Sequence, residues 1–169
     1  MGSECGPEVT IEPLEAPEFG TAAVWLGNPQ INRWLTSEWR GQPVSTRMVA
    51  VAVRNRRNRI YVIRHNNAAC GLVGLSDIDL VDSTGMIWYL RGERHLSGGG
   101  VTTHAVRAAV RRSVDELGLV SIYAWIMEDN LPSRRVLEKA GFREVGRIRQ
   151  AARSGDRRVD RVYFDWVHG

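Results

Sequence analysis

Cysteine is scarce in this sequence, and long apolar stretches are absent from it. The 169 residues include two cysteines, Cys5 and Cys70, and neither belongs to a C-x-x-C pair. We therefore expect neither a disulfide framework nor a metal site. No run approaches the roughly 18 consecutive apolar residues of a membrane helix, and the opening residues, MGSECGP, lack a basic stretch followed by an apolar one. These absences predict a cytoplasmic protein with no membrane partner.

The remaining composition is that of one folded domain. Hydrophobic residues make up 43% of the chain and charged residues 25%, which is too apolar for intrinsic disorder. A chain of this length suits a single domain. Because no repeat, low-complexity tract or linker interrupts positions 8–167, we expect a flexible N-terminal segment over 1–8 and one domain over 9–169.

The chain is moderately basic, and nearly all of its positive charge is arginine. Lys and Arg number 23 against 19 Asp and Glu, which gives a net charge of +4. The densest cluster, RNRRNR at positions 54–59, invites a phosphate-bearing partner because arginine binds phosphate bidentately. No aromatic residue is interleaved with it, and no nucleic-acid motif surrounds it. We therefore favour a solvated helix end and turn, with nucleic-acid binding as the alternative.

Hydrophobic periodicity and turn residues predict an α+β order of elements. We expect strands over 9–11, 60–63, 70–80, 86–90, 121–126, 143–150 and 158–167. We expect helices over 16–26 and 30–35, a third capped by Ser45 or Thr46, a fourth capped by Thr102 or Thr103 and ended by Gly118, and a fifth between Asn130 and Gly141. This order predicts a mixed sheet with helices packed against it.

Three consecutive glycines, Gly98 to Gly100, separate the strand over 86–90 from the next helix. Glycine lets the backbone approach a ligand closely, and a helix N-terminus adds partial positive charge. The segment can therefore cradle a phosphate, although it has no P-loop lysine and does not fit G-x-G-x-x-G. A flexible surface turn is the alternative explanation.

A second pattern is more specific. The segment from Asn130 to Phe142 reads N-x-x-S-x-x-V-L-E-K-x-G-F, and GGGVTTHAV occupies positions 98–106. Together they resemble the signatures of the GNAT superfamily of N-acyltransferases, in the form used by its RimJ/RimL-like branch. The likeness extends to GLVGLSDID at 71–79 and to a closing hairpin near 149–163, so it covers roughly positions 9–167.

The resemblance implies both a fold and a donor. It implies a single domain with a splayed mixed sheet, in which acetyl-CoA or another acyl-CoA sits in a V-shaped opening beside the strand over 86–90. Amides of residues 98–103 would bind the pyrophosphate, and main-chain groups over 88–90 would pair with the pantetheine arm. The cofactor-binding residues implied are Trp88, Tyr89, Leu90, Ser97, Gly98, Gly99, Gly100, Val101, Thr102, Thr103 and Asn130. No metal is implied.

Two residues of the second pattern are candidates for catalysis. An amine that attacks a thioester needs a proton donor for the departing thiolate. Ser133, at the expected helix start, carries a hydroxyl that could supply or relay this proton, or it could only stabilise the first turn of the helix. Asn130 could orient a ligand through its amide, or equally stabilise the strand-to-helix turn.

The expected acceptor site combines aromatic walls with carboxylates. Trp34 and Trp39 lie in the region that walls the acceptor pocket in GNAT proteins, and flat rings suit an amino sugar or another ring. Covering the edge of the core is the alternative role for both residues. The carboxylates that could face the acceptor are Asp77, Glu93, Asp79 and Glu38, and surface solvation is the alternative for each.

Two residues depart from the family pattern. Ser97 stands where the first signature often begins with Arg or Gln, and Ala152 stands where RimJ/RimL-like members commonly carry a Glu directed at the acceptor. We therefore expect the acceptor or the general base to differ from theirs. His104, one turn inside its helix, is expected to be satisfied by a neighbour rather than to act as the base.

These observations predict an acyl-CoA-dependent N-acyltransferase. It would move an acetyl or short acyl group to a primary amine of a small molecule, such as an antibiotic, an amino sugar or a biosynthetic intermediate, by direct attack in a ternary complex. A protein N-terminal acetyltransferase of the ribosomal-protein type is the nearest alternative, and a non-catalytic acyl-CoA-binding module is another. An acyl carrier protein could replace CoA as the donor. We expect a monomer or a homodimer.

Overall fold

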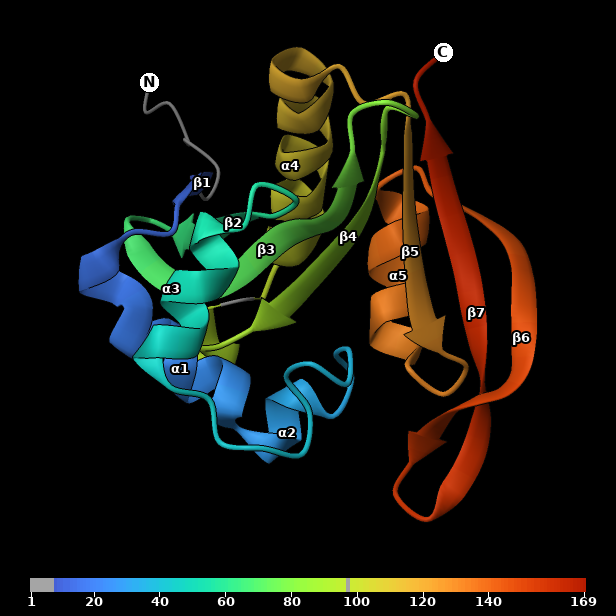
Figure 1. Cartoon of the computed structure of the whole chain (residues 1–169), viewed down its shortest axis with the longest axis horizontal. Helices are drawn as coiled ribbons and strands as arrows, with labels where there is room; N and C mark the ends of the chain where they lie inside the picture. Colours follow the sequence, from blue (N-terminus) through green and yellow to red (C-terminus); the bar gives the residue numbers. More distant parts are fainter. Residues whose placement is uncertain (1–7, 97) are drawn as a thin grey trace, which may run out of the picture.

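The structure is a computed structural model that describes residues 8–96 and 98–169. Within these residues, seven strands form one sheet in the order β1-β2-β3-β4-β5-β7-β6 (Figure 1). The strands are β1 (Val9–Pro13), β2 (Arg59–His65), β3 (Ala68–Asp79), β4 (Thr84–Arg91), β5 (Ser121–Met127), β6 (Arg143–Ser154) and β7 (Arg157–Val167). Every expected strand is present, and the sheet is mixed as predicted.

The sheet opens between β4 and β5. These two strands are parallel, whereas the other neighbouring pairs of the described sheet are antiparallel. Their pairing ends at Met86↔Tyr123 within the described residues, although β4 continues to Arg91 and β5 to Met127. Beyond Met86 the two strands diverge (Figure 1). The expected splayed sheet is thereby confirmed.

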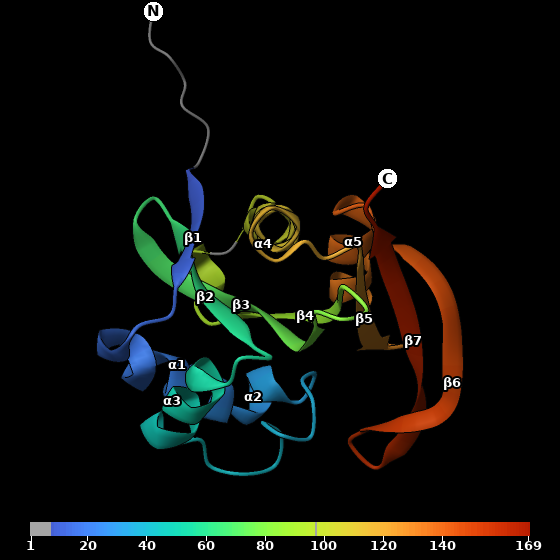
Figure 2. The same ribbon diagram turned by 45° about the horizontal axis from the view of Figure 1, so that its top comes forward.

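Helices cover both faces of the sheet (Figure 2). One face carries α4 (Val101–Leu117) and α5 (Leu131–Lys139), and the other carries α1 (Phe19–Gly27), α2 (Pro29–Asn32) and α3 (Thr46–Arg54). Short 3-10 turns occupy Ala16–Glu18 and Arg94–Leu96. Among the helices described, none combines the length and the apolar character needed to cross a bilayer.

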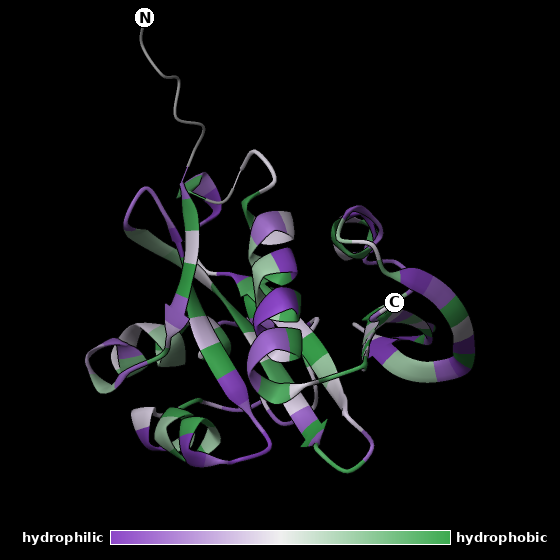
Figure 3. Ribbon diagram, turned by 90° about the horizontal axis from the view of Figure 1, so that it is seen from above, coloured by the Kyte–Doolittle hydropathy of each residue, from purple (hydrophilic) through white to green (hydrophobic). Residues whose placement is uncertain are grey.

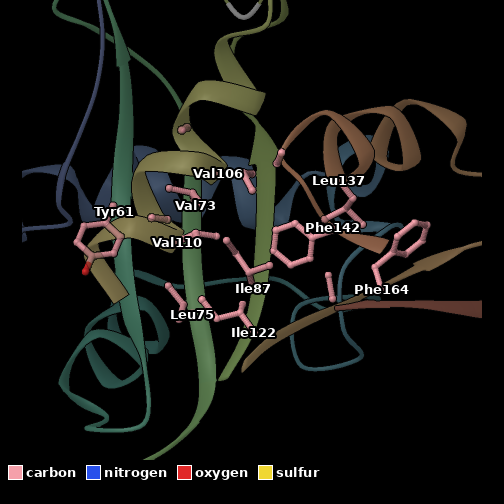
Figure 4. Packing of buried hydrophobic residues seen from close by; sticks show 14 of the residues in the cluster. Tyr61, Val73, Leu75, Ile87, Val106, Val110, Ile122, Leu137, Phe142 and Phe164 are labelled. Carbon is pink, nitrogen blue, oxygen red and sulfur yellow. The ribbon is translucent and has the colours of Figure 1, made fainter. Parts of the chain in front are cut away.

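The larger core lies between the sheet and the α4–α5 layer. Val106 and Val110 of α4 are buried against strand residues that include Val73 and Ile87 (Figure 4). Full burial of such a side chain contributes roughly 1.5–3 kcal/mol. The sequence of α4 alternates hydrophilic and hydrophobic residues along the helix (Figure 3), so one face packs on the sheet while the other meets solvent.

A second core fills the space between the sheet and α1–α3. Trp25 and Leu26 of α1 pack there with Val49 of α3 and with strand residues such as Leu72. The buried side chain of Asn32 donates hydrogen bonds to the carbonyl oxygens of Leu26 at 2.8 Å and of Trp39 at 3.1 Å. These two bonds fix the chain that follows α2, which becomes one wall of the site described below.

The predicted caps of α3 and α4 are resolved differently. Ser45 caps α3, because its side chain accepts a hydrogen bond from the amide of Met48. The prediction that Thr102 or Thr103 caps α4 is wrong: the N-cap is Gly100, in a left-handed conformation. Glycine turns the chain there at little steric cost, which places both threonines inside the first turn, where they are buried.

The first two helices also differ in extent from the prediction. The helix expected over 16–26 begins as a 3-10 turn that includes Pro17, and α1 proper starts at Phe19. The helix expected over 30–35 is the short α2, which begins one residue earlier because Asn28 accepts a hydrogen bond from the amide of Gln30 and Pro29 opens the helix.

The expected flexible segment over 1–8 lies outside the described residues except for Glu8, whose carbonyl accepts a hydrogen bond from the amide of Asn66. The cluster over 54–59 forms the end of α3 and the turn into β2. There the Arg57 side chain donates to the carbonyl of Ile78, as expected for a helix end and turn.

Candidate active site

A cleft opens where β4 and β5 separate. Its empty volume is about 720 Å³, including the part open to solvent. The walls come from β4, β5, the start of α5 and the segment over 34–39 that follows α2. The lining residues are Trp34, Leu35, Thr36, Glu38, Trp39, Asn58, Ile60, Ser76, Met86, Ile87, Trp88, Tyr89, Ala124, Trp125, Ile126, Asn130, Ser133 and Leu137.

One wall of the cleft is an unpaired strand edge. On its β3 side, β4 remains paired through Gly74↔Trp88 and Val73↔Tyr89. On its other side β5 has diverged, so the second edge of β4 beyond Met86 has no strand partner within the described residues. An extended ligand can pair with such an edge as an added strand. Main-chain groups over 87–91 are therefore placed to hold a linear chain of amides.

The glycine segment lies directly before α4 and is open to solvent. Gly99 has φ +64° and Gly100 φ +84°, a region that favours glycine. A Cβ added at Gly98 or Gly99 would meet nothing within 4 Å, and at Gly100 it would lie 3.9 Å from the His104 ring. The Val101 amide donates to the Gly98 carbonyl at 3.3 Å, whereas the next two amides of α4, at Thr102 and Thr103, have no acceptor within the helix and carry partial positive charge. The arrangement suits an anion such as a pyrophosphate. Ser97 lies outside the described residues.

Asn130 and Ser133 meet at the start of α5. The Asn130 side chain, 6% exposed, is the N-cap, and its Oδ1 accepts a hydrogen bond from the Ser133 amide at 3.3 Å. Asn130 therefore stabilises the strand-to-helix turn, which was one of the two roles expected for it. Ser133 takes part in this cap through its main chain, so its hydroxyl is not needed for capping. Both residues line the cleft.

Tyr89 connects β4 to α5 across the cleft. Its hydroxyl donates a hydrogen bond to the Ser133 carbonyl oxygen at 3.0 Å. Burial raises the pKa of Tyr89 far above its usual value, and a hydrogen bond with the side chain of Ser133, distinct from the bond to its carbonyl, opposes this shift. The phenol therefore stays protonated at neutral pH. Sequence reasoning implied only main-chain contacts for Tyr89, because nothing local in the sequence shows that its ring crosses to α5.

Two tryptophans from distant parts of the chain form an aromatic wall. Trp34 and Trp125 both line the cleft and pack on a small buried cluster of Met127, Ala152 and Val159. Sequence reasoning did not single out Trp125. Ala152 is 3% exposed, so a glutamate at this position would place a carboxylate under the tryptophans at a desolvation cost. The alanine that replaces the family's glutamate thus belongs to an apolar floor of the cleft, formed by the cluster beneath the two tryptophans.

Trp39 also lines the cleft, but it is only 6% exposed and packs in the second core. Trp39 therefore covers the edge of the core, which was the alternative role expected for it.

Glu38 is the carboxylate residue among those that line the cleft. Asp77 lies in an adjoining hollow that Glu38 also lines, together with Arg57. Asp77 has φ +51° and falls where the register of β3 against β4 shifts. It therefore lies in a β-bulge. The structure thus brings Glu38 and Asp77 to the same end of the cleft.

The other candidate carboxylates and His104 lie elsewhere. Glu93 accepts a hydrogen bond from the indole of Trp25 in α1 at 3.1 Å. Asp79 accepts hydrogen bonds from the amides of Val81 and Asp82, which lower the pKa of its carboxyl group. Both carboxylates therefore have structural contacts. His104 is exposed on α4.

Comparison with known proteins assigns this fold and cleft to a family. A family model described as an acetyltransferase (GNAT) domain matches residues 8–143. The chain therefore belongs to the GNAT acetyltransferase family, and the resemblance seen in its two signature segments is confirmed. Among the described residues, no group of three or more His, Cys, Asp or Glu side chains is placed to hold a metal ion.

Two curated relatives, both from Bacillus subtilis, match parts of the chain. The probable N-acetyltransferase YjcK is 45% identical over 67 residues, which cover 40% of this chain and 36% of that protein. The putative ribosomal N-acetyltransferase YdaF is 28% identical over 100 residues, 59% of this chain and 54% of that protein. The chain thus spans between a third and about half of these relatives' lengths.

Solved structures show the same fold over nearly the whole chain. The spermidine N-acetyltransferase of Vibrio cholerae, in complex with CoA and spermine, superposes with a TM-score of 0.82 at 19% identity, covering 94% of this chain and 95% of that one. A probable acetyltransferase superposes with a TM-score of 0.78 at 22% identity, covering 94% and 92%. At these identities the likeness concerns the fold.

Proposed function

We propose that the protein is an N-acetyltransferase that moves an acetyl group from acetyl-CoA to a primary amine of a small molecule. The observation that carries this proposal is the cleft between β4 and β5, which joins an unpaired strand edge to the start of α5. Family membership and the CoA complex of the V. cholerae enzyme with the same fold support it. A related short acyl group on CoA is compatible with the same cleft.

The chain offers two holding elements for the donor. The amides of Gly98 to Thr103 would bind the pyrophosphate at the N-terminus of α4. The free edge of β4 at Trp88 and Tyr89 would pair with the amides of the pantetheine arm. The thioester then enters the cleft beside Ser133, which lines it.

The transfer needs a base, an attack and an acid. The amine nitrogen, once deprotonated, forms a bond to the thioester carbonyl carbon, and the carbon–sulfur bond breaks to release a thiolate. Glu38, the carboxylate among the lining residues, is the candidate that takes the proton from the amine, directly or through water. The Ser133 hydroxyl is the candidate that passes a proton to the thiolate and receives one in return from the nitrogen that has bonded to the carbonyl carbon, so that no alkoxide remains. Holding both reactants in one cleft supplies the remaining advantage by proximity.

The acceptor is expected to carry a ring. Trp34 and Trp125 offer flat walls on one side of the cleft, and ring scaffolds bury more area there than an extended peptide start. Release of free thiol from acetyl-CoA, corrected for hydrolysis without acceptor, measures the kcat/KM of each acceptor. Ring-bearing primary amines should show a higher kcat/KM than peptides beginning with Ala or Ser. A peptide preferred tenfold, about 1.4 kcal/mol of transition-state binding, would favour the ribosomal-protein type of activity instead.

Three alternatives are decided by thiol release together with calorimetry. The name of YdaF, a putative ribosomal N-acetyltransferase, favours a protein N-terminus as acceptor, whereas the apolar floor at Ala152 favours the small molecule. Tight CoA binding in calorimetry with no thiol release from any amine would indicate a non-catalytic module. Higher turnover with acetylated acyl carrier protein than with acetyl-CoA would identify the carrier as the donor.

A further inference from the structure

A second hollow shares Trp34 with the cleft. It has an empty volume of about 640 Å³, including open solvent, and is lined by Arg33, Trp34, Arg40, Arg153, Ser154 and Gly155. Because Trp34 lines both spaces, a molecule bound in the cleft can extend past this ring. Three arginines, from the segment around α2 and from the β6–β7 hairpin, then lie within its reach.

These three arginines form no ion pair within the part of the chain that the structure describes. The Arg33 guanidinium lies 4.5 Å from the centroid of the Trp34 ring. Arg40 donates a hydrogen bond to the main-chain carbonyl of Arg153 at 3.4 Å, which leaves its charge uncompensated. The nearby carboxylates on the hairpin side are Asp129, whose oxygen accepts a hydrogen bond from the Ser154 hydroxyl at 2.8 Å, and Asp156, which directly follows the lining residue Gly155.

The second tryptophan wall is also backed by an arginine. The Arg161 guanidinium lies 4.2 Å from the centroid of the Trp125 ring, and its buried Nε has no hydrogen-bond partner in the described residues. Glu38 lines the cleft but not this hollow, and it is exposed. Among the residues that line the hollow, three are arginines and none is a carboxylate, so positive charge is in excess there. Such an excess attracts anions, and the planar arginine group binds carboxylate and phosphate oxygens in pairs.

We propose that the acceptor carries an anionic group, a carboxylate or a phosphate, in addition to its reacting amine. The anionic group binds in the hollow of Arg33, Arg40 and Arg153, while the body of the acceptor lies against Trp34. This inference rests on the proposed transferase function and adds a substrate class to it. A polyamine such as spermidine meets like charge at the same place and is a poor acceptor.

Matched acceptors test the anionic group directly. The probes are para-aminomethylbenzoate, its amide para-aminomethylbenzamide, the corresponding phosphonate and spermidine, with thiol release as the readout. The benzoate or the phosphonate should exceed the amide at least tenfold in kcat/KM, about 1.4 kcal/mol, and spermidine should rank below the amide. Comparing the benzoate with the phosphonate tells which anion the hollow prefers.

Arginine variants show whether this hollow causes the preference. Arg40→Gln and Arg153→Gln should each reduce the ratio of kcat/KM for the acid over the amide by threefold or more. Arg47→Gln serves as the matched control, because Arg47 is an exposed arginine of α3 outside both hollows, and its ratio should not change. An amide used as well as both acids, or a ratio that neither variant lowers, overturns the inference while thiol release still supports the transferase.

Absence of turnover with every amine would instead contradict the transferase proposal. Equilibrium binding of the benzoate and the amide in the presence of CoA then decides the anion site separately. Tighter binding of the benzoate that weakens in Arg153→Gln supports the site, whereas equal binding of the two probes contradicts it.

Discussion

At the scale of single residues, Asn130 and Ser133 have separable roles at the start of α5. Asn130 caps the helix by accepting a hydrogen bond from the Ser133 amide, and the Ser133 carbonyl accepts one from Tyr89. Both contacts use the main chain of Ser133. Removal of the hydroxyl therefore leaves these two main-chain contacts in place, although it removes the side-chain hydrogen bond with Tyr89.

The variant Ser133→Ala tests the proton-donor role. We expect kcat to fall by roughly ten- to a thousandfold, while the Kd of acetyl-CoA stays nearly constant. The free energy of unfolding should change by less than about 0.5 kcal/mol, since no cap is lost. Kinetics, calorimetry and urea unfolding on the same sample measure all three.

Asn130→Ala is the control for this experiment, because it removes the cap and should cost about 1 kcal/mol of stability. If kcat of Ser133→Ala falls less than about threefold, thiolate protonation does not depend on this hydroxyl.

At the scale of elements, α4 begins and ends on glycines with positive φ. Gly100 is its N-cap with φ +84°, and Gly118 is its C-cap with φ +65°. A β-branched residue is strained at either position. Only the N-terminal glycine, however, lies at the proposed pyrophosphate site, so the two ends of one helix separate strain from binding.

We predict that Gly100→Val weakens acetyl-CoA binding by at least several-fold, because the new side chain strains the turn and occupies the space where a phosphate approaches. Both variants should lower the free energy of unfolding by similar amounts, because both positions have a positive φ. Gly118→Val, however, should leave the Kd of acetyl-CoA unchanged. Calorimetric titration of CoA into both variants, alongside their melting temperatures, makes the comparison. Equal CoA affinity in wild type and Gly100→Val would remove the pyrophosphate from this turn.

The elements show how far local sequence patterns reach. Gly118 and Gly141 were predicted as helix ends because glycine tolerates the left-handed conformation found at both. The bulges at Asp77 and Gln150 carry no such signal, since register depends on the partner strand. Trp34 was predicted as part of the acceptor wall, but its meeting with Trp125 and Ala152 was beyond prediction, because these residues come together only when β5, β6 and the segment after α2 do.

At the scale of the whole molecule, two halves of the sheet are joined by a short contact. The pairing of β4 with β5 ends at Met86, yet the larger core contains residues from both halves, such as Val73 and Phe164 (Figure 4). Packing under α4 and α5 therefore holds the halves together and allows the strands to diverge on the opposite side. The cleft therefore forms because core packing, and not strand pairing, holds the two halves of the sheet together beyond Met86.

Desolvation of ionisable side chains also sets a pH limit on stability. Desolvation raises the pKa of Tyr61, Tyr89 and Tyr123 above the usual value, and it does the same for the Cys70 thiol. The unfolded chain releases these protons near their ordinary pKa values, about 8.5 for Cys and about 10 for Tyr, while the folded protein retains them. Stability is therefore fully present below these values and falls as pH rises through them.

We predict that the free energy of unfolding, measured with urea, is nearly level from about pH 7 to pH 8 and declines up to about pH 11. Tyr89→Phe should be less stable than wild type at about pH 7, by roughly 1 kcal/mol, because the Ser133 carbonyl loses its donor. Its decline above about pH 10 should nevertheless be shallower, since the residue with the most strongly raised tyrosine pKa no longer titrates in the unfolded chain. A wild-type stability that stays level or rises up to about pH 11, or a decline of equal steepness in Tyr89→Phe, would show that buried Tyr89 does not limit alkaline stability.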